Sequence, residues 1–183
     1  MHDGYAHLAG CTDCPMQALL MIQPSKHPDL PRITVVEDSD EDYSALSRAL
    51  KQLGHPVSLD RFVRGEDALH SLKESVQGNL PALMLLDLNL PGIGGGEVLK
   101  RVRQHEPTKS LPVIVLSSSD NPQEVAWCYQ QGANAYHVKG FNYVDFCQSV
   151  DRIFQYWFST VRLPRGSLGL PKSPSDEGAA GLS

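Results

Sequence analysis

The fold is decided by one short stretch, Ala82-Leu83-Met84-Leu85-Leu86-Asp87, in which an apolar run ends in an acid. An earlier run, Ile33-Thr34-Val35-Val36, ends in the same way in Glu37-Asp38. Such runs are typical of buried parallel strands, whose carboxyl ends emerge at one edge of the sheet, where open α/β sheets bind ligands. The three carboxylates would then crowd one small space. Because they repel one another unless a hard cation lies among them, the sequence predicts a Mg²⁺-type site.

Outward from these runs, short β-rich stretches alternate with amphipathic helices. We expect strands at 32–37, 57–62, 82–87, 113–116 and 135–138, each followed by a helix, with the last helix at 142–161. In the helix after the fourth strand, Val125, Ala126 and Tyr129 are expected to face the core. The alternation predicts an α/β fold with a parallel sheet between two layers of helices and right-handed crossovers.

The length of 183 residues fits one domain with tails. We place the domain at 32–162, after a flexible extension at 1–31 and before a disordered tail at 163–183, which is rich in Gly, Pro, Ser and Ala. A net charge of -5 argues against general nucleic-acid binding. No stretch approaches the ~20 apolar residues of a membrane span and the start lacks a secretory signal, so we expect a cytoplasmic protein.

The cysteines are expected to be unpaired, with Cys128 and Cys147 reduced within helices. Cys11 and Cys14 form a C-x-x-C downstream of His2 and His7, which formally supplies four zinc ligands. A zinc site needs a framework that holds tetrahedral geometry, and this segment has little from which to build one. We therefore favour a flexible tail over a zinc knuckle.

Two further predicted strands end in polar residues, Ser117 and Lys139. Each such residue alone is more often a helix cap or a solvated charge. Together with the acids they form a set that keeps the phase of the βα units: Glu37, Asp38, Asp87, Ser117 and Lys139. A carboxylate beside Mg²⁺ can attack phosphorus, while a lysine and a hydroxyl bind the phosphoryl oxygens, so the set predicts a phosphoryl-acceptor site.

At this point the chain resembles a known family, the response-regulator receiver domains. The resemblance covers about 32–161 and is carried by four blocks: Val35-Val36-Glu37-Asp38-Ser39, Leu86-Asp87-Leu88-Asn89-Leu90-Pro91-Gly92, Val113-Ile114-Val115-Leu116-Ser117-Ser118-Ser119 and Gly132-Ala133-Asn134-Ala135-Tyr136-His137-Val138-Lys139. It implies the doubly wound, flavodoxin-like (βα)5 fold, with five parallel strands in the order 2-1-3-4-5.

The resemblance also implies the roles of individual residues. Asp87 would take a phosphoryl group from a phosphohistidine of a sensor histidine kinase. Mg²⁺ would be held by Asp38, Asp87 and the backbone carbonyl of Asn89, with Glu37 acting through water. Ser117 and Lys139 would bind the phosphoryl group, and Asn89 and Ser119 would tune its hydrolysis. Tyr136 would turn inward as a switch, the alternative being a half-buried strand tyrosine.

The sequence departs from the family pattern at two positions. Gly140 stands where a proline after a cis peptide bond is usual, and a cis bond before glycine would cost about 3 kcal/mol. The local loop and the reach of Lys139 are therefore open at this stage. Glu37 replaces a more common aspartate, and we expect its longer side chain to work through water.

The last predicted helix carries more aromatic residues than one inward stripe requires. Among them we assign Phe154, Tyr156, Trp157 and Phe158 to a homodimer interface, the alternative being that they cover the edge of the receiver's own core. An aromatic end of this kind, followed by Leu163-Pro164, is similar to the single-domain regulators of phytochrome-type histidine kinases.

The sequence leads to a signalling protein without an output domain rather than an enzyme, capable at most of Mg²⁺-dependent self-phosphorylation from small phosphodonors and of autodephosphorylation. One alternative is a scaffold pseudo-receiver that is never phosphorylated and acts through its dimer surface. Another is a Mg²⁺-dependent phosphohydrolase, but such an enzyme needs a general acid two residues after Asp87, where Asn89 stands.

Overall fold

The computed structural model describes residues 30–75, 80–140, 142–161 and 163. The centre is a five-stranded parallel sheet in the order β2-β1-β3-β4-β5. Its strands are β1 (Arg32–Val36), β2 (Ser58–Phe62), β3 (Leu83–Leu86), β4 (Val113–Ser117) and β5 (Ala135–Val138). The predicted fold class and strand order are confirmed.

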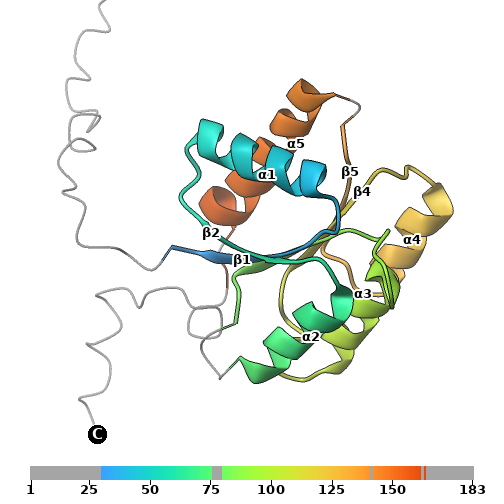
Figure 1. The fold of residues 1–183 in the computed structure, drawn as a ribbon. Coiled ribbons are helices and arrows are strands. Elements are labelled where there is room, and N and C mark those ends of the chain that lie inside the picture. The colour runs from blue at the N-terminus through green and yellow to red at the C-terminus, as the bar shows by residue number, and fades with distance from the viewer. Residues whose placement is uncertain (1–29, 76–79, 141, 162, 164–183) are drawn as a thin grey trace, which may run out of the picture.

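Helices cover both faces of the sheet (Figure 1). One face carries α1 (Asp40–Leu53) and α5 (Tyr143–Gln155), and the other carries α2 (Gly65–Glu74), α3 (Gly94–Gln104) and α4 (Pro122–Gln130). Each layer encloses its own apolar core, because successive residues of a strand point to opposite faces. Leu83 and Leu85 pack under α1 and α5, while Met84 and Leu86 pack on the opposite face.

The register of β1 against β3 brings the acidic strand ends together. Val36 pairs with Leu86, so that Glu37 and Asp87 follow at the same edge of the sheet. The backbone N–H of Asp87 donates to the carbonyl of Val36 at 3.0 Å. The ladder thus continues up to Asp87 itself and fixes its backbone.

The start of α1 is fixed by its cap. Ser39 lies outside the helix in an extended conformation, and its hydroxyl accepts a hydrogen bond from the backbone N–H of Asp42 at 3.1 Å. Such a bond satisfies one of the free N–H groups of the first turn. At the other end Gly54 adopts the left-handed conformation, with φ of 71°, and ends the helix.

Two predictions of burial are wrong. In α4 the buried residue is Cys128, whereas Ala126 is exposed and Tyr129 is 51% exposed. In α5 Phe154, assigned from the sequence to a dimer interface, is 1% exposed and stacks on Phe158 with the ring centroids 5.5 Å apart. Phe154 is therefore a core residue, because the helix turns it toward the sheet and not toward solvent.

The last helix ends earlier as an α-helix than expected. After Gln155 the backbone continues as a π-helical turn, η2 (Tyr156–Thr160). The wider turn changes the angular spacing of the aromatic side chains, leaving Tyr156 52% exposed while Trp157 and Phe158 pack partly on the core.

Several sequence predictions lie outside the described residues. These are the proposed ligands of the zinc alternative, His2, His7, Cys11 and Cys14, and nearly all of the extension and the tail. Within the described part of the chain, Cys128 and Cys147 are free thiols. In the same part, the model contains no helix with the length and apolar character that crossing a membrane requires.

Candidate functional site

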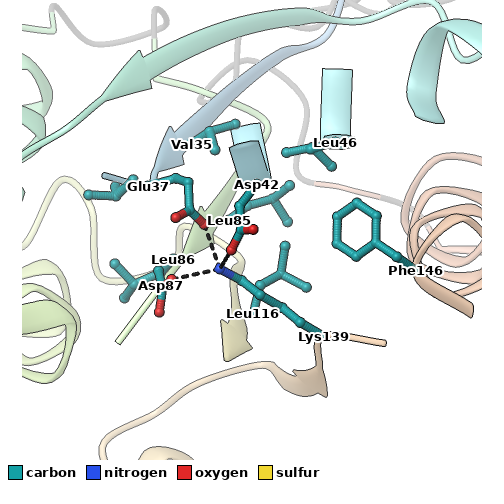
Figure 2. A pocket seen from close by; sticks show the side chains of 11 residues that line it. Val35, Glu37, Asp42, Leu46, Leu85, Leu86, Asp87, Leu116, Lys139 and Phe146 are labelled. Carbon is teal, nitrogen blue, oxygen red and sulfur yellow. Dashed lines mark hydrogen bonds and ion pairs between the residues drawn. The ribbon is translucent and has the colours of Figure 1, made fainter. Parts of the chain in front are cut away.

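The ammonium group of Lys139 lies at the centre of the acidic edge of the sheet (Figure 2). Its Nζ donates to Asp42 Oδ2 at 2.6 Å, to Glu37 Oε2 at 2.7 Å and to Asp87 Oδ2 at 2.7 Å. The side chain is 12% exposed. One largely buried cation therefore joins carboxylates from the end of β1, the first turn of α1 and the end of β3.

Asp87 is held at both carboxylate oxygens. Oδ1 accepts a hydrogen bond from the backbone N–H of Asn89 at 2.9 Å, and Oδ2 accepts from Lys139. The residue is 7% exposed. A Cβ on Gly95 would overlap the carbonyl oxygen of Asp87, so a glycine is required where α3 passes close to the backbone of Asp87.

The charges of the site balance only in part. Burial raises the pKa of Glu37 above its ordinary value, and this effect outweighs the hydrogen bond and attraction of Lys139, which lower it. Burial alone would lower the pKa of Lys139, but the hydrogen bonds to Asp42, Asp87 and Glu37 outweigh it and raise that pKa. The lysine is therefore a permanent cation in an environment with excess negative charge.

Sequence reasoning missed Asp42. The missed signal is its spacing: Asp42 precedes Leu46 by four residues and therefore lies on the same, inward face of α1. Carboxylate oxygens of Glu37, Asp42 and Asp87 all lie within 4.8 Å of one another. This donor set fits a hard divalent cation such as Mg²⁺, which takes oxygen ligands.

Asp38, predicted from the family resemblance as a metal ligand, is exposed and its side chain lies outside this group of three carboxylates. Its backbone is held instead. The guanidinium of Arg61, on the neighbouring strand β2, donates through Nε to the carbonyl of Glu37 and through Nη2 to the carbonyl of Asp38, both at 3.0 Å. Arg61 also pairs with Asp40 at 2.6 Å and stacks on Tyr43. Sequence reasoning also missed this clamp.

Ser117 lies at the same edge, at the end of β4. It is fully buried, and its hydroxyl accepts a hydrogen bond from the backbone N–H of Ser119 at 3.2 Å. The backbone N–H of Lys139 donates to the carbonyl of Ser117 at 2.7 Å, which continues the β4–β5 ladder. The predicted neighbours Ser117 and Lys139 are therefore brought together by the sheet.

Tyr136 is half-buried and points from β5 toward the start of α4. Its hydroxyl lies 2.8 Å from the carbonyl oxygen of Ser119 and 2.6 Å from Glu124 Oε1, so one proton is shared between two acceptors. Burial and the bond to Glu124 raise the pKa of Tyr136 to about 12. The tyrosine thus links β5 to the loop that follows Ser117.

The question left open at Gly140 is answered by its surroundings. The bond between Lys139 and Gly140 is trans. A Cβ at position 140 would lie 2.7 Å from the backbone nitrogen of Phe146 and 2.9 Å from the carbonyl carbon of Asp145. The first turn of α5 therefore passes so close that only glycine fits, and Lys139 still reaches all three carboxylates.

Comparison with known proteins agrees with this geometry. A family model, the response regulator receiver domain, matches residues 33–151. The chain belongs to the response regulator receiver family.

Its relatives include stand-alone regulators. The response regulator Rcp1 of Synechocystis is 36% identical over 135 residues, which cover 72% of this chain and 92% of Rcp1. The phosphorylated cyanobacterial phytochrome response regulator RcpA matches with a TM-score of 0.69 and 33% identity over 74% of this chain and 99% of its own. The Mn²⁺-bound form of Rcp1 matches with a TM-score of 0.67 and 35% identity, covering 73% and 99%.

These findings establish a signalling protein of two-component systems, with the receiver fold and with homology to phytochrome-associated regulators. Among the described residues there is no second folded domain that could serve as an output. The site does not support the phosphohydrolase alternative. The residue two positions after Asp87 is Asn89, which donates its backbone N–H to Asp87 and is not a general acid.

Proposed function

We propose that this chain is a phosphorylation switch that accepts a phosphoryl group on Asp87 from the phosphohistidine of a sensor histidine kinase. The observation that carries the proposal is the environment of Asp87: a strand-end carboxylate, held by a backbone N–H and by the ammonium of Lys139, with further carboxylates beside it. Isolated buried carboxylates are costly, and a cluster of this kind points to function.

The transfer itself needs little covalent chemistry from the protein. An Asp87 oxygen attacks phosphorus, the P–N bond to the kinase imidazole breaks, and the phosphoryl group becomes an acyl phosphate on Asp87. Lys139 pairs with one phosphoryl oxygen, and the hydroxyl of Ser117 donates to another once the loop after β4 moves. Orientation and charge compensation provide the catalysis.

We assign Mg²⁺ to the acidic edge, held by Asp38, Asp87 and the carbonyl of Asn89, with Glu37 acting through water. Bound there, the ion would neutralise charge on the phosphoryl oxygens. The clustered carboxylates of Glu37 and Asp87 support this assignment, and Asp38 and Asn89 enter it from the family resemblance. Asn89 is exposed and Ser119 follows Ser117 in the same loop, which suits their proposed effect on hydrolysis.

The signal would leave the site through Tyr136. Because its hydroxyl is bonded to the carbonyl of Ser119, any movement of the loop after Ser117 changes the support of the tyrosine and of α4. The output would then be a change in protein–protein contacts on the surface of α4, β5 and α5.

For the partner, we infer a phytochrome-type histidine kinase, acting in the cytoplasm and without nucleic acid or membrane contact. The support is the homology to Rcp1 and to the phytochrome response regulator RcpA, which extends over nearly the whole length of both relatives.

The test of the acceptor uses the whole chain, acetyl phosphate and Mg²⁺, with intact-protein mass spectrometry. We expect one phosphoryl group on the natural chain and none on Asp87→Asn. Asp67→Asn, an exposed acid in the first turn of α2, serves as the matched control and should label normally. Labelling that persists in Asp87→Asn contradicts the proposal, and a natural chain that takes no label supports the scaffold alternative.

We also propose a homodimer through the end of the last helix, with Tyr156, Trp157 and Phe158 at the contact. Tyr156 is 52% exposed, a large value for an aromatic beside two others. Light scattering checks it: Tyr156→Asp should yield monomers, while Ser159→Asp, which adds the same charge at an exposed neighbour, should leave a dimer. A natural chain that is monomeric with and without acetyl phosphate would exclude the interface.

A further inference from the structure

We propose that Asp42 is a positioning residue that holds the ammonium of Lys139 in place for phosphoryl transfer to Asp87. The inference rests on the proposed function, since it concerns the same site. It assigns a task to an acid outside the set that the sequence and the resemblance single out.

All three ammonium protons of Lys139 are used. Each meets a different carboxylate, and the shortest of the three distances, 2.6 Å, is the one to Asp42. The side chains of Glu37 and Asp87 are 7% and 8% exposed, whereas that of Asp42 is 43% exposed. Asp42 therefore lies at the rim of the site, and the other two carboxylates lie at its floor.

The position of Lys139 needs a support of this kind. The lysine follows the last residue of β5, and its long stem must cross from there to the ends of β1 and β3. The stem extends over apolar side chains that line the same pocket, among them Leu46, Leu116 and Phe146 (Figure 2). Apolar contacts of this type fix the stem but not the direction of the ammonium group.

Asp42 is well suited to fix that direction. Its backbone N–H is bonded to the hydroxyl of Ser39, so the residue sits in a capped first turn of α1. A carboxylate in the first turn also lies at the end of the helix where the free N–H groups attract negative charge. Lys139 is thus anchored to a rigid helix end that takes no part in the covalent chemistry.

In this arrangement Asp42 and Asp87 have different tasks: Asp42 holds the ammonium of Lys139, and Asp87 accepts the phosphoryl group. When Asp87 takes up a phosphoryl group, Lys139 gives up its bond to Asp87 and pairs with a phosphoryl oxygen, and Asp42 keeps the ammonium close enough to do so. Without Asp42 the ammonium would contact only Glu37 and Asp87, and both of these carboxylates belong to the set that we assign to Mg²⁺. Removal of Asp42 should therefore weaken Mg²⁺ binding and slow phosphorylation together.

A double-mutant cycle tests whether Asp42 acts through Lys139. It compares the natural chain with Asp42→Asn, Lys139→Met and the double variant, and measures Mg²⁺ affinity by calorimetry and the rate of labelling by acetyl phosphate. We expect Asp42→Asn to lower both by about tenfold in the natural chain and to have less than about a twofold effect in the Lys139→Met background.

Glu41→Gln is the matched control, since it removes one negative charge from the same helical turn without contacting Lys139. It should change Mg²⁺ affinity by less than about twofold. An equal loss of Mg²⁺ affinity in Asp42→Asn and Glu41→Gln would mean that Asp42 acts only through its negative charge and not through its contact with Lys139. A tenfold loss that persists in the Lys139→Met background would make Asp42 a metal ligand. Either result overturns the proposal.

A second measurement needs neither the Lys139→Met variant nor Mg²⁺ nor a phosphodonor. In ¹⁵N NMR the NH₃⁺ group of Lys139 should be slow to exchange with water in the natural chain and faster in Asp42→Asn. Equal exchange in the two contradicts the proposal. If the natural chain takes up no phosphoryl group, the proposed function fails, whereas this spectrum and the calorimetry still decide whether Asp42 holds Lys139.

Discussion

The hydroxyl of Tyr136 and the carboxylate of Glu124 are joined at 2.6 Å, which ties the edge strand β5 to the first turn of α4. The same hydroxyl lies 2.8 Å from the carbonyl of Ser119, in the loop that follows β4. One side chain therefore connects the predicted phosphoryl-binding loop with the helix whose surface would change on signalling.

This link predicts a pH dependence of stability. Burial and Glu124 raise the pKa of Tyr136 to about 12, whereas an unfolded tyrosine ionises near about pH 10. Between these values the folded state holds more protons than the unfolded state, so the free energy of unfolding should fall as the pH rises and be unaffected by this group below that window. Urea unfolding of the natural chain and of Tyr136→Phe at a series of alkaline pH values should show the additional fall only in the natural chain. Parallel curves would contradict the assignment.

The ionised carboxylate of Glu37 is expected to lower the free energy of unfolding. Since its pKa is raised, its contribution to stability is present at acidic pH, below the ordinary glutamate pKa, and is lost as the pH rises through the raised value. At neutral pH, Glu37→Gln should therefore raise the free energy of unfolding by about 1 kcal/mol and weaken Mg²⁺ binding. Denaturant unfolding and calorimetry measure the two effects. Glu106→Gln, at an exposed ion pair, should change neither, and a destabilised Glu37→Gln would refute the argument.

Arg61 is expected to set the geometry of the acidic loop after β1. Its planar guanidinium bonds two carbonyls through two separate nitrogens held in a fixed geometry, which the single nitrogen of a lysine does not reproduce. Arg61→Lys keeps the charge, so a loss of Mg²⁺ affinity, by about tenfold, would report the lost geometry alone. Arg32→Lys is the control, because Arg32 also bonds an aspartate, Asp60, through two nitrogens, but at the other end of the same strand pair. If Arg61→Lys binds Mg²⁺ as tightly as the control Arg32→Lys, the two bonds from Arg61 to the backbone carbonyls have no part in metal binding.

The close approach at Gly140 predicts that its replacement disturbs Lys139. In Gly140→Ala the new Cβ would press on backbone atoms of Asp145 and Phe146, which cannot move like a flexible side chain. We expect a loss of about 1–3 kcal/mol in the free energy of unfolding and slower labelling of Asp87 by acetyl phosphate.

Gly54→Ala provides the comparison for Gly140→Ala. Position 54 has φ of 71°, and a Cβ there would meet nothing within 4 Å, so only backbone strain is introduced, far along α1 from the site. Its labelling rate should equal that of the natural chain. A normal rate in Gly140→Ala as well would mean that the loop after Lys139 adapts freely.

The strand ends could be located from the sequence because buried parallel strands have a simple signature. Apolar runs that end in Glu37, Asp87 and Ser117 predict both the strands and the shared edge, and the structure places these residues at that edge. Backbone hydrogen bonds between paired parallel strands fix their register, and the register fixes where their carboxyl ends lie. The chemical roles of all the predicted site residues stay predictions, including metal binding by Asp38, the effect of Asn89 and Ser119 on hydrolysis and the switch role of Tyr136.

The parts that the sequence could not provide depend on how separate elements pack. Arg61 meets the carbonyls of Glu37 and Asp38 only because β2 pairs with β1, and the exposed Tyr129 and buried Phe154 depend on how α4 and α5 are rotated against the sheet.

The sequence by itself determined the α/β fold and the family and predicted Asp87 as the acceptor, because period, strand ends and residue type are local properties of the chain. Only the tertiary structure decided that Asp42 belongs to the site and that Gly140 leaves Lys139 within reach. Both depend on distances between α1, β5 and α5, which are far apart in the chain, and a carboxylate or an ammonium acts on a neighbour only across a few ångströms.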